Sequence, residues 1–254
     1  KVKMTEQRNI DGVNVSDLSP MQAMDVKKKL DACGISVSAI GSPLGKIQLT
    51  DTMDAHLEQL KQTCDTAEIM GCRRIRIFSF YIPDGKYDEY RNEVIDRIGR
   101  MLDIAETYGL SLCHENEKGI YGDVAARCLK IHQEVPELKC IFDPANYIQC
   151  HQPTLEGWEM LHGYVKYLHI KDALADGSVV PAGNGEGHLP EILKAFTAQG
   201  GDHVTIEPHL AIFDGLKNLE QEGNTSEIGR FVYPSNDAAF DAACQALKTV
   251  LAES

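Results

Sequence analysis

Four residues that can bind a metal ion or move a proton recur at regular intervals along the chain. They are Glu115, Asp143, His169 and Glu207, separated by 28, 26 and 38 residues. Each lies at or near the end of a short apolar segment that is predicted to be a strand. These spacings match one strand followed by one helix, the last being lengthened by a loop. We therefore expect the four side chains at the same edge of a parallel sheet, where α/β barrels carry their chemistry.

Three carboxylates and an imidazole at one place favour a bound cation. Without one, the carboxylates would repel each other strongly. A single strand-end Asp or Glu is commonly a helix cap or a solvated loop residue, but four at successive strand ends predict a metal site. An oxygen-rich ligand set with one nitrogen suits a divalent ion with room for substrate oxygens. We expect Mn²⁺, with Mg²⁺, Co²⁺ or Zn²⁺ as alternatives.

Short β-rich segments alternate with longer amphipathic segments along the whole chain. The expected strands are 2–7, 36–41, 74–81, 110–115, 139–144, 166–171 and 203–208. The expected helices are 20–33, 52–71, 88–108, 122–135, 153–162, 188–198 and 236–252. This alternation predicts a parallel sheet with helices outside, either an open doubly wound sheet or a (β/α)8 barrel.

Seven strand–helix units are visible, one fewer than a complete (β/α)8 barrel needs. Because the chain opens almost directly in a strand, we expect that a first βα unit is missing before Lys1. The length and the 43% apolar content suit one large core, so residues 1–254 are predicted to be a single domain. The long irregular segment at about 210–235 could be a lid or an interface loop.

Four motifs carry a resemblance to a known family. They are "HEN" (114–116), "FDPANY" (142–147), "YLHIKD" (167–172) and "TIEPHL" (205–210). Together they resemble the xylose isomerase-like TIM-barrel family of sugar and sugar phosphate isomerases and epimerases. The resemblance extends over essentially the whole chain, and "EQRNIDGVNVSDLS" and "GSPLGK" near the start resemble one of its subgroups, in which this segment is the second βα unit. It implies that Glu115, Asp143, His169 and Glu207 are the metal ligands.

Such a site predicts proton abstraction next to a carbonyl. The metal acts as a Lewis acid that stabilises an ene-diolate, while a carboxylate takes the proton and the same or an opposite carboxylate returns it. In the 3-epimerases that the chain resembles, the two metal-bound glutamates share this work. The resemblance thus implies that Glu115 and Glu207 are the catalytic residues.

Further polar residues near the strand ends are candidates for substrate binding. Lys171 lies on the same face as His169 and could bind a substrate oxygen, or it could pair with Asp172. His114 should point away from its neighbour Glu115 and could orient another residue instead of touching substrate. The complete set of candidates is Glu6, Arg8, Lys46, His114, Asn146, Lys171 and Glu186.

The remaining candidates also have alternative interpretations. Glu6 and Arg8 could hold a hydroxyl or phosphate, or form a salt bridge at the rim, and Lys46 could reach an anionic group. Asn146 stands where epimerases of the family usually have a histidine, which weakens an assignment as a tagatose 3-epimerase. The glycine-rich segment 181–188, with Glu186, could cradle a phosphate through backbone N–H groups, or be a flexible βα loop.

Composition narrows the class of protein. The 25 basic and 38 acidic residues give a net charge of −13, which disfavours nucleic acid and anionic membranes as partners. The eight cysteines are scattered, as expected for buried thiols in a reducing compartment, and no segment reaches the length of a membrane span. We expect a cytoplasmic enzyme of carbohydrate metabolism that acts on a small-molecule sugar or sugar phosphate. A homo-oligomer is the expected assembly on the base rate for such enzymes.

Three other functions use the same type of barrel. A dehydratase-type lyase acting on a keto-sugar or inosose would share the metal site and the first proton abstraction, then expel a hydroxyl. A non-catalytic sugar-binding subunit would lack turnover. Endonuclease IV belongs to the same superfamily, but its three-zinc site needs additional His and Asp ligands, and this chain has Asn146 where one such histidine would stand.

Overall fold

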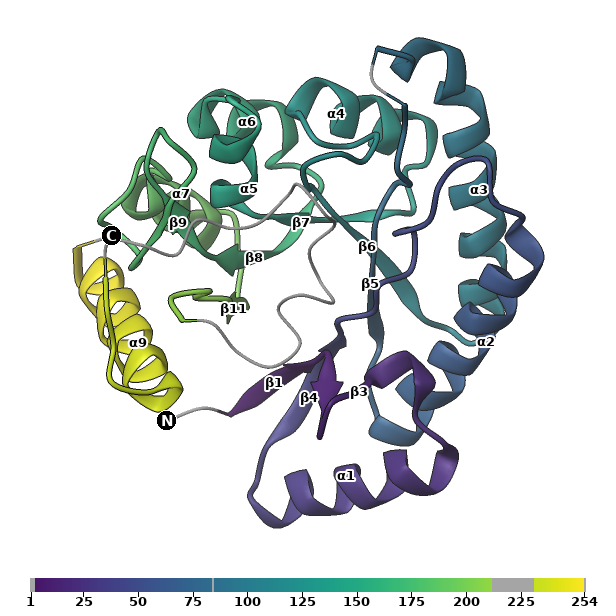
Figure 1. The fold of residues 1–254 in the computed structure, drawn as a ribbon, viewed down its shortest axis with the longest axis horizontal. Helices are drawn as coiled ribbons and strands as arrows, with labels where there is room; N and C mark the ends of the chain where they lie inside the picture. Colours follow the sequence, from purple (N-terminus) through teal and green to yellow (C-terminus); the bar gives the residue numbers. More distant parts are fainter. Residues whose placement is uncertain (1–2, 84, 212–230, 254) are drawn as a thin grey trace. The chain divides into compact units, whose positions relative to one another are not determined.

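The structure is a computed structural model that describes residues 3–83, 85–211 and 231–253 (Figure 1). The contacts between residues divide the chain into two compact units. The N-terminal unit comprises residues 1–115, 119–121 and 130–139, and the C-terminal unit comprises 116–118, 122–129 and 140–254. The strands of the central sheet follow the order β1-β4-β5-β6-β7-β8-β11, so the described residues contribute the seven strands that the alternating pattern predicts.

The N-terminal unit contains four parallel strands of the sheet and the helices that cover them. Figure 1 shows α2 and α3 lying outside β5 and β6. The strands are β1 (Met4–Gln7), β4 (Ser36–Ile40), β5 (Arg74–Ile77) and β6 (Ser111–Glu115). The helices are α1 (Pro20–Ala32), α2 (Met53–Met70) and α3 (Tyr87–Thr107). A small antiparallel pair, β2 (Asn9–Ile10) and β3 (Val13–Asn14), and the 3₁₀ helix η1 (Val15–Asp17) precede α1.

The C-terminal unit contains the remaining parallel strands. These are β7 (Lys139–Phe142), β8 (Val165–Ile170) and β11 (Val204–Ile206). Its helices are α5 (Pro144–Gln149), α6 (Thr154–Leu161), α7 (Leu189–Ala198) and α9 (Asn236–Glu253), while α4 (Ala125–Glu134) begins in this unit. An antiparallel pair, β9 (Asp172–Ala173) and β10 (Val179–Val180), follows β8.

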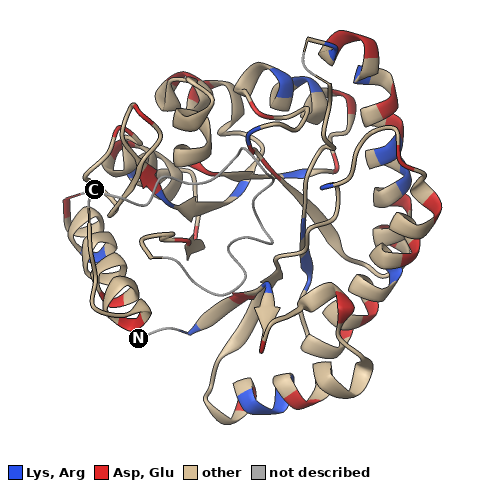
Figure 2. Cartoon of the chain, in the orientation of Figure 1, with Lys and Arg blue, Asp and Glu red and all other residues tan. Residues whose placement is uncertain are grey.

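Each unit has its own apolar core between strands and helices. In the N-terminal unit, Ile75 and Ile77 of β5 pack with Leu60 of α2 and Ile98 of α3. In the C-terminal unit, aromatic and aliphatic side chains of β7, α6 and α7 pack together around Trp158. Charged residues gather on the helices and loops (Figure 2), so a charged side chain inside a strand stands out.

Sequence signals located most element boundaries to within a few residues. The expected start of the first helix is confirmed: Ser19 caps α1 in a capping box with Gln22, and Pro20 is its first residue. The strand expected over 74–81 ends earlier, at Ile77, and Phe80 has a positive φ of 66°. The short helix α5 was not expected. Most of the predicted lid at 210–235 lies outside the described residues.

The structure bears on two further expectations. Among the described residues, no helix is both long and apolar enough to span a bilayer. All eight cysteines are free thiols, and five of them are buried. The five buried cysteines therefore contribute to packing as small apolar residues.

Candidate metal centre

Three of the four predicted ligands lie in the C-terminal unit, at the carboxyl ends of its strands. Asp143 directly follows β7, His169 is the penultimate residue of β8, and Glu207 directly follows β11. The pairing of Thr205 with His169 sets β11 beside β8, and the Glu207 amide continues the ladder by donating to the Ile170 carbonyl at 3.1 Å. Parallel strands of matched register therefore deliver these three side chains to one edge.

Asp143 is both a predicted ligand and a helix cap. Its Oδ1 accepts a hydrogen bond from the Asn146 amide at 3.0 Å, which caps α5, and Pro144 is the first residue of that helix. Its Oδ2 lies 3.1 Å from the Lys171 ammonium. The helix-cap interpretation and the ligand interpretation of this residue are thus compatible, because they use different oxygens.

A buried polar network surrounds Asp143. Asn116 bonds reciprocally with the Asp143 backbone: its Nδ2 donates to the carbonyl and its Oδ1 accepts from the amide, both at 3.0 Å. Asn146 Nδ2 donates to the Asn116 carbonyl at 2.8 Å, and Lys171 Nζ donates to Asn146 Oδ1 at 2.7 Å. Asn116 directly follows Glu115 in the chain. A buried hydrogen-bond network of this kind restricts the motion of its members.

The ammonium of Lys171 contacts Asp143 and Asn146, and the residue is 6% exposed. Asp172, the partner considered from sequence, accepts hydrogen bonds from backbone amides of the glycine-rich segment.

Glu207 lies between two imidazoles. Its Oε2 is 2.9 Å from His169 Nδ1, and its Oε1 is 3.1 Å from His209 Nε2. The positive φ of His209, 43°, turns the chain just after Glu207. His209 is therefore an additional residue of the site that orients the Glu207 carboxylate.

The fourth predicted ligand, Glu115, ends β6 in the N-terminal unit. Its Oε2 accepts a hydrogen bond from Arg76 Nη1 at 3.0 Å, and both side chains are buried. Glu6, also buried, lies 3.9 Å from the same Arg76 nitrogen. Arg76 thus supplies a positive charge beside Glu115, as Lys171 does beside Asp143.

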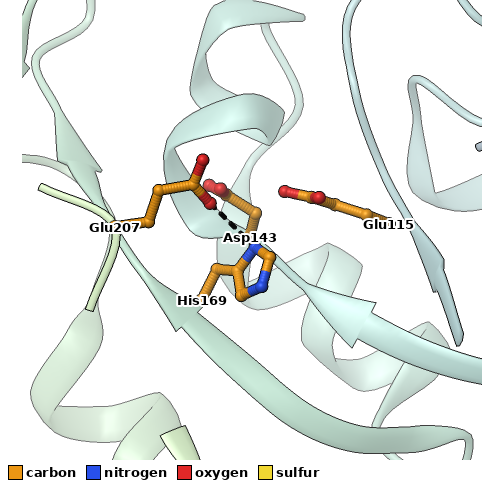
Figure 3. Close-up of side chains that lie close together, drawn as sticks. All are labelled: Glu115, Asp143, His169 and Glu207. Carbon is orange, nitrogen blue, oxygen red and sulfur yellow. Dashed lines mark ion pairs between the residues drawn. The ribbon is translucent and has the colours of Figure 1, made fainter. Parts of the chain in front are cut away.

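The structure brings all four predicted ligands together (Figure 3). One ligand atom from each of Glu115, Asp143, His169 and Glu207 lies within 4.8 Å of the others, and each residue is at most 7% exposed. Three carboxylates and one imidazole in a buried space are the donor set that Mn²⁺, Mg²⁺, Co²⁺ and Zn²⁺ accept. The residues therefore fit a divalent ion, and the four side chains lie close together, as their spacing in the sequence led us to expect.

Other predicted site residues of the N-terminal unit are engaged in local contacts. Glu6 and Arg8 form an ion pair at 3.4 Å, and Lys46 Nζ lies 4.4 Å from the centre of the Phe78 ring. His114 is fully buried, with Nε2 at 3.0 Å from Ser79 Oγ.

The surroundings of His114 favour a packing role. Its ring lies edge-on to His132 at 6.0 Å between centroids. Burial, followed by the neighbouring His132, lowers the pKa of His114 to about 3, so the imidazole is neutral at physiological pH.

The glycine-rich segment 181–188 wraps around Asp172. The amides of Gly183 and Gly185 donate to Asp172 Oδ2 at 2.9 and 3.0 Å, and that of Gly187 donates to Oδ1 at 2.9 Å. Burial raises the pKa of Asp172, while these amides act in the opposite direction. The expectation that these glycine amides cradle a phosphate is wrong, because an internal carboxylate already occupies them. Glu186 is exposed on the same segment, and its contact with substrate stays a prediction.

Sequence reasoning missed four residues of this region. His209 lies two residues after Glu207, so the same two-residue period that selected Lys171 beside His169 could have found it. Arg76 is a charged residue inside an apolar strand segment, which is rare unless the charge is paired. The partners of Asn116 and Asp172 carry no signal in the sequence, because they are mainly backbone groups.

The comparison with family models identifies the class. The model described as "Xylose isomerase-like TIM barrel" matches residues 3–226, and the chain belongs to this family. The resemblance seen in the four motifs and the α/β barrel class are thereby confirmed. No curated protein sequence matches the chain.

Several solved structures share the fold. A xylose isomerase domain protein from Planctomyces limnophilus is 25% identical, with a TM-score of 0.62, over 74% of this chain and 76% of that one. The IolI protein with a bound zinc atom is 16% identical, with a TM-score of 0.71, over 99% and 88%. D-psicose 3-epimerase with D-tagatose from Clostridium cellulolyticum H10 is 14% identical, with a TM-score of 0.70, over 92% and 84%.

Proposed function

We propose that the protein is a metal-dependent isomerase or epimerase that acts on a sugar or sugar phosphate by proton transfer next to a carbonyl. The observation that carries this proposal is the buried cluster of Glu115, Asp143, His169 and Glu207 at strand ends of a xylose isomerase-like barrel. Two structural neighbours, the IolI protein with a bound zinc atom and D-psicose 3-epimerase, support it. Mn²⁺ is the ion we propose.

The four side chains would hold the ion, which supplies Lewis-acid polarisation of a substrate carbonyl when it is bound. Glu115 and Glu207 come from well-separated strands, β6 and β11, and so can reach a small substrate from two directions. We assign the proton abstraction and return to these two carboxylates. Their burial excludes bulk water, which strengthens the electrostatic interactions within the site.

Neighbouring side chains would bind and orient the substrate. Lys171 is the strongest candidate, because its ammonium is already held at the cluster by Asp143 and Asn146 and can turn toward a substrate oxygen. Asn146 offers its amide from the same network. The remaining proposed contacts are Glu6, Arg8, Lys46 and Glu186.

Proton exchange in heavy water tests the proposal. Purified protein is stripped with EDTA, reloaded with Mn²⁺ and incubated in D₂O with a panel of ketoses and ketose phosphates. We expect ¹H NMR to show metal-dependent exchange at the carbon next to the carbonyl, with formation of an isomer. A Glu207→Gln variant at saturating Mn²⁺ should lose about 10²–10⁴-fold in exchange rate, whereas the exposed-surface control Glu159→Gln should not change.

The outcomes separate the competing functions. Product that has lost water would establish a dehydratase-type lyase on the same site. Binding of Mn²⁺ and of a sugar without exchange would indicate a non-catalytic subunit. Absence of Mn²⁺ binding, measured by elemental analysis, would refute the metal centre itself.

A further inference from the structure

Arg76 is a buried arginine of β5 that was not among the predicted site residues. It is 3% exposed, and each guanidinium nitrogen has a partner. Nε donates to the Ser42 carbonyl at 3.3 Å, Nη2 to the Gly41 carbonyl at 3.1 Å, and Nη1 to Glu115 Oε2 at 3.0 Å. The guanidinium carbon also lies 4.9 Å from the centre of the Phe78 ring.

These contacts hold the guanidinium in one orientation. The two carbonyls belong to the segment directly after β4, and the ring of Phe78 covers the guanidinium. On the other side, β5 pairs with β6 so that Arg76 lies opposite Cys113, two residues before Glu115. Burying a guanidinium is costly unless its nitrogens have hydrogen-bond partners, and here backbone carbonyls accept from two of the three, Nε and Nη2. The third nitrogen, Nη1, is therefore directed at Glu115 with little freedom.

We propose that Arg76 is the positioning residue for Glu115. By holding Oε2, it fixes the orientation in which the Glu115 carboxylate meets a divalent ion. This inference rests on the proposed metal site. Hydrogen bonds from outer residues to metal ligands commonly raise metal affinity about 10–100-fold by fixing the ligand geometry.

Simple charge compensation is the competing explanation. A cation beside three carboxylates would lessen their mutual repulsion in the metal-free protein, yet it would also repel a metal ion. In that case Lys at position 76 would serve as well as Arg, and removal of the charge would tighten metal binding. The planar fork of Arg cannot be replaced by Lys where geometry matters. The two explanations thus predict opposite results.

Isothermal titration of the EDTA-treated full chain with Mn²⁺ distinguishes them. We expect the Kd to rise about 10–100-fold in both Arg76→Lys and Arg76→Met. The matched control is Arg97→Met. Arg97 is also buried, contacts an aromatic ring at 5.6 Å and pairs with a carboxylate, but it belongs to α3 and contacts no predicted ligand. The Arg97→Met variant should bind Mn²⁺ with the same Kd as the wild type.

The visible spectrum of the Co²⁺-loaded protein supplies a second readout. In Arg76→Lys we expect an altered spectrum, because the Glu115 carboxylate is no longer held in one orientation. If Arg76→Met does not fold, Arg76→Lys alone decides. A wild-type Kd and spectrum in Arg76→Lys, or tighter binding in Arg76→Met, would overturn the inference while leaving the metal site intact. Failure of the wild type to bind Mn²⁺ or Co²⁺ would instead overturn the proposed function, and this inference with it.

Discussion

Replacing Asp172 by Asn should destabilise the protein, because this carboxylate organises the glycine-rich segment. Its two oxygens accept four backbone hydrogen bonds: from Gly183 and Gly185 to Oδ2, and from Gly187 and Ala173 to Oδ1. An Asn side chain has one acceptor oxygen and one NH₂ group. Whichever way it rotates, the NH₂ faces two N–H donors, and two hydrogen bonds are lost.

The cost follows from those two bonds. Each buried donor left unsatisfied costs about 1–3 kcal/mol. Part of this loss is recovered, because burial disfavours the ionised carboxylate and raises the pKa of Asp172. We expect a net loss of about 2–4 kcal/mol, which lowers the Tm by roughly 5–10 °C for a domain of about this size. Gly185 and Gly187 pack directly against the carboxylate, since a Cβ at either position would be only 2.3 or 2.6 Å from Oδ1.

Thermal unfolding followed by circular dichroism checks this expectation. The matched control is Asp176→Asn, since Asp176 also accepts a backbone hydrogen bond, from Ser178 at 3.0 Å, but is exposed. Its cost should stay below about 1 kcal/mol. Equal melting temperatures for the two variants would refute the view that Asp172 organises the segment.

Two further predictions concern the stability of the N-terminal unit. Burial, with a smaller effect of Arg97, lowers the pKa of His56 to about 4 from 6.5, and its Nε2 accepts a hydrogen bond from the Gly45 amide. The unfolded state therefore binds more protons than the folded state between pH 6.5 and 4, so the free energy of unfolding should fall by about 2–3 kcal/mol as the pH is lowered through this range. The His56→Gln variant should show a weaker pH dependence of the Tm. The same pH dependence in this variant as in the wild type would contradict the role given to His56. Gly45→Ala should cost more than about 3 kcal/mol in urea unfolding, because φ is 89° and a Cβ would lie 2.0 Å from the Phe78 carbonyl oxygen. Gly34→Ala, at φ 66° with no atom within 4 Å, should cost only about 1 kcal/mol, and equal costs would refute the steric explanation.

The positions of the candidate ligands at strand ends could be predicted from the sequence because they depend on local rules. Asp143, His169 and Glu207 each end an apolar strand segment, and the carboxyl ends of parallel strands meet at one edge. The helix α5 escaped prediction because "DPANYIQ" is short and directly follows a strand, although its Asp-Pro start is a regular helix signal. The early end of β5 was also missed, since "FSFY" is apolar and typical of a strand.

Long-range partners could not be predicted in this way. Arg76 contacts Glu115 across 39 residues, and Asn116 bonds to Asp143 across 27. Neither spacing identifies the partner, because many carboxylates and backbone groups lie at similar separations. The phosphate-cradle hypothesis for 181–188 was wrong for the same reason: the glycines were visible in the sequence, but the carboxylate that occupies their amides was not.

By itself the sequence determined the order of strands and helices, the family, and the residue types that end each strand, because periodicity and turn chemistry are local properties. Only the tertiary structure decided which groups contact one another. Lys171 shows the difference: its sequence neighbour Asp172 bonds to the glycine-rich segment, while Lys171 itself reaches Asp143 and Asn146. Alternation along a strand sends neighbouring residues to opposite faces, and parallel pairing brings the ends of adjacent strands together.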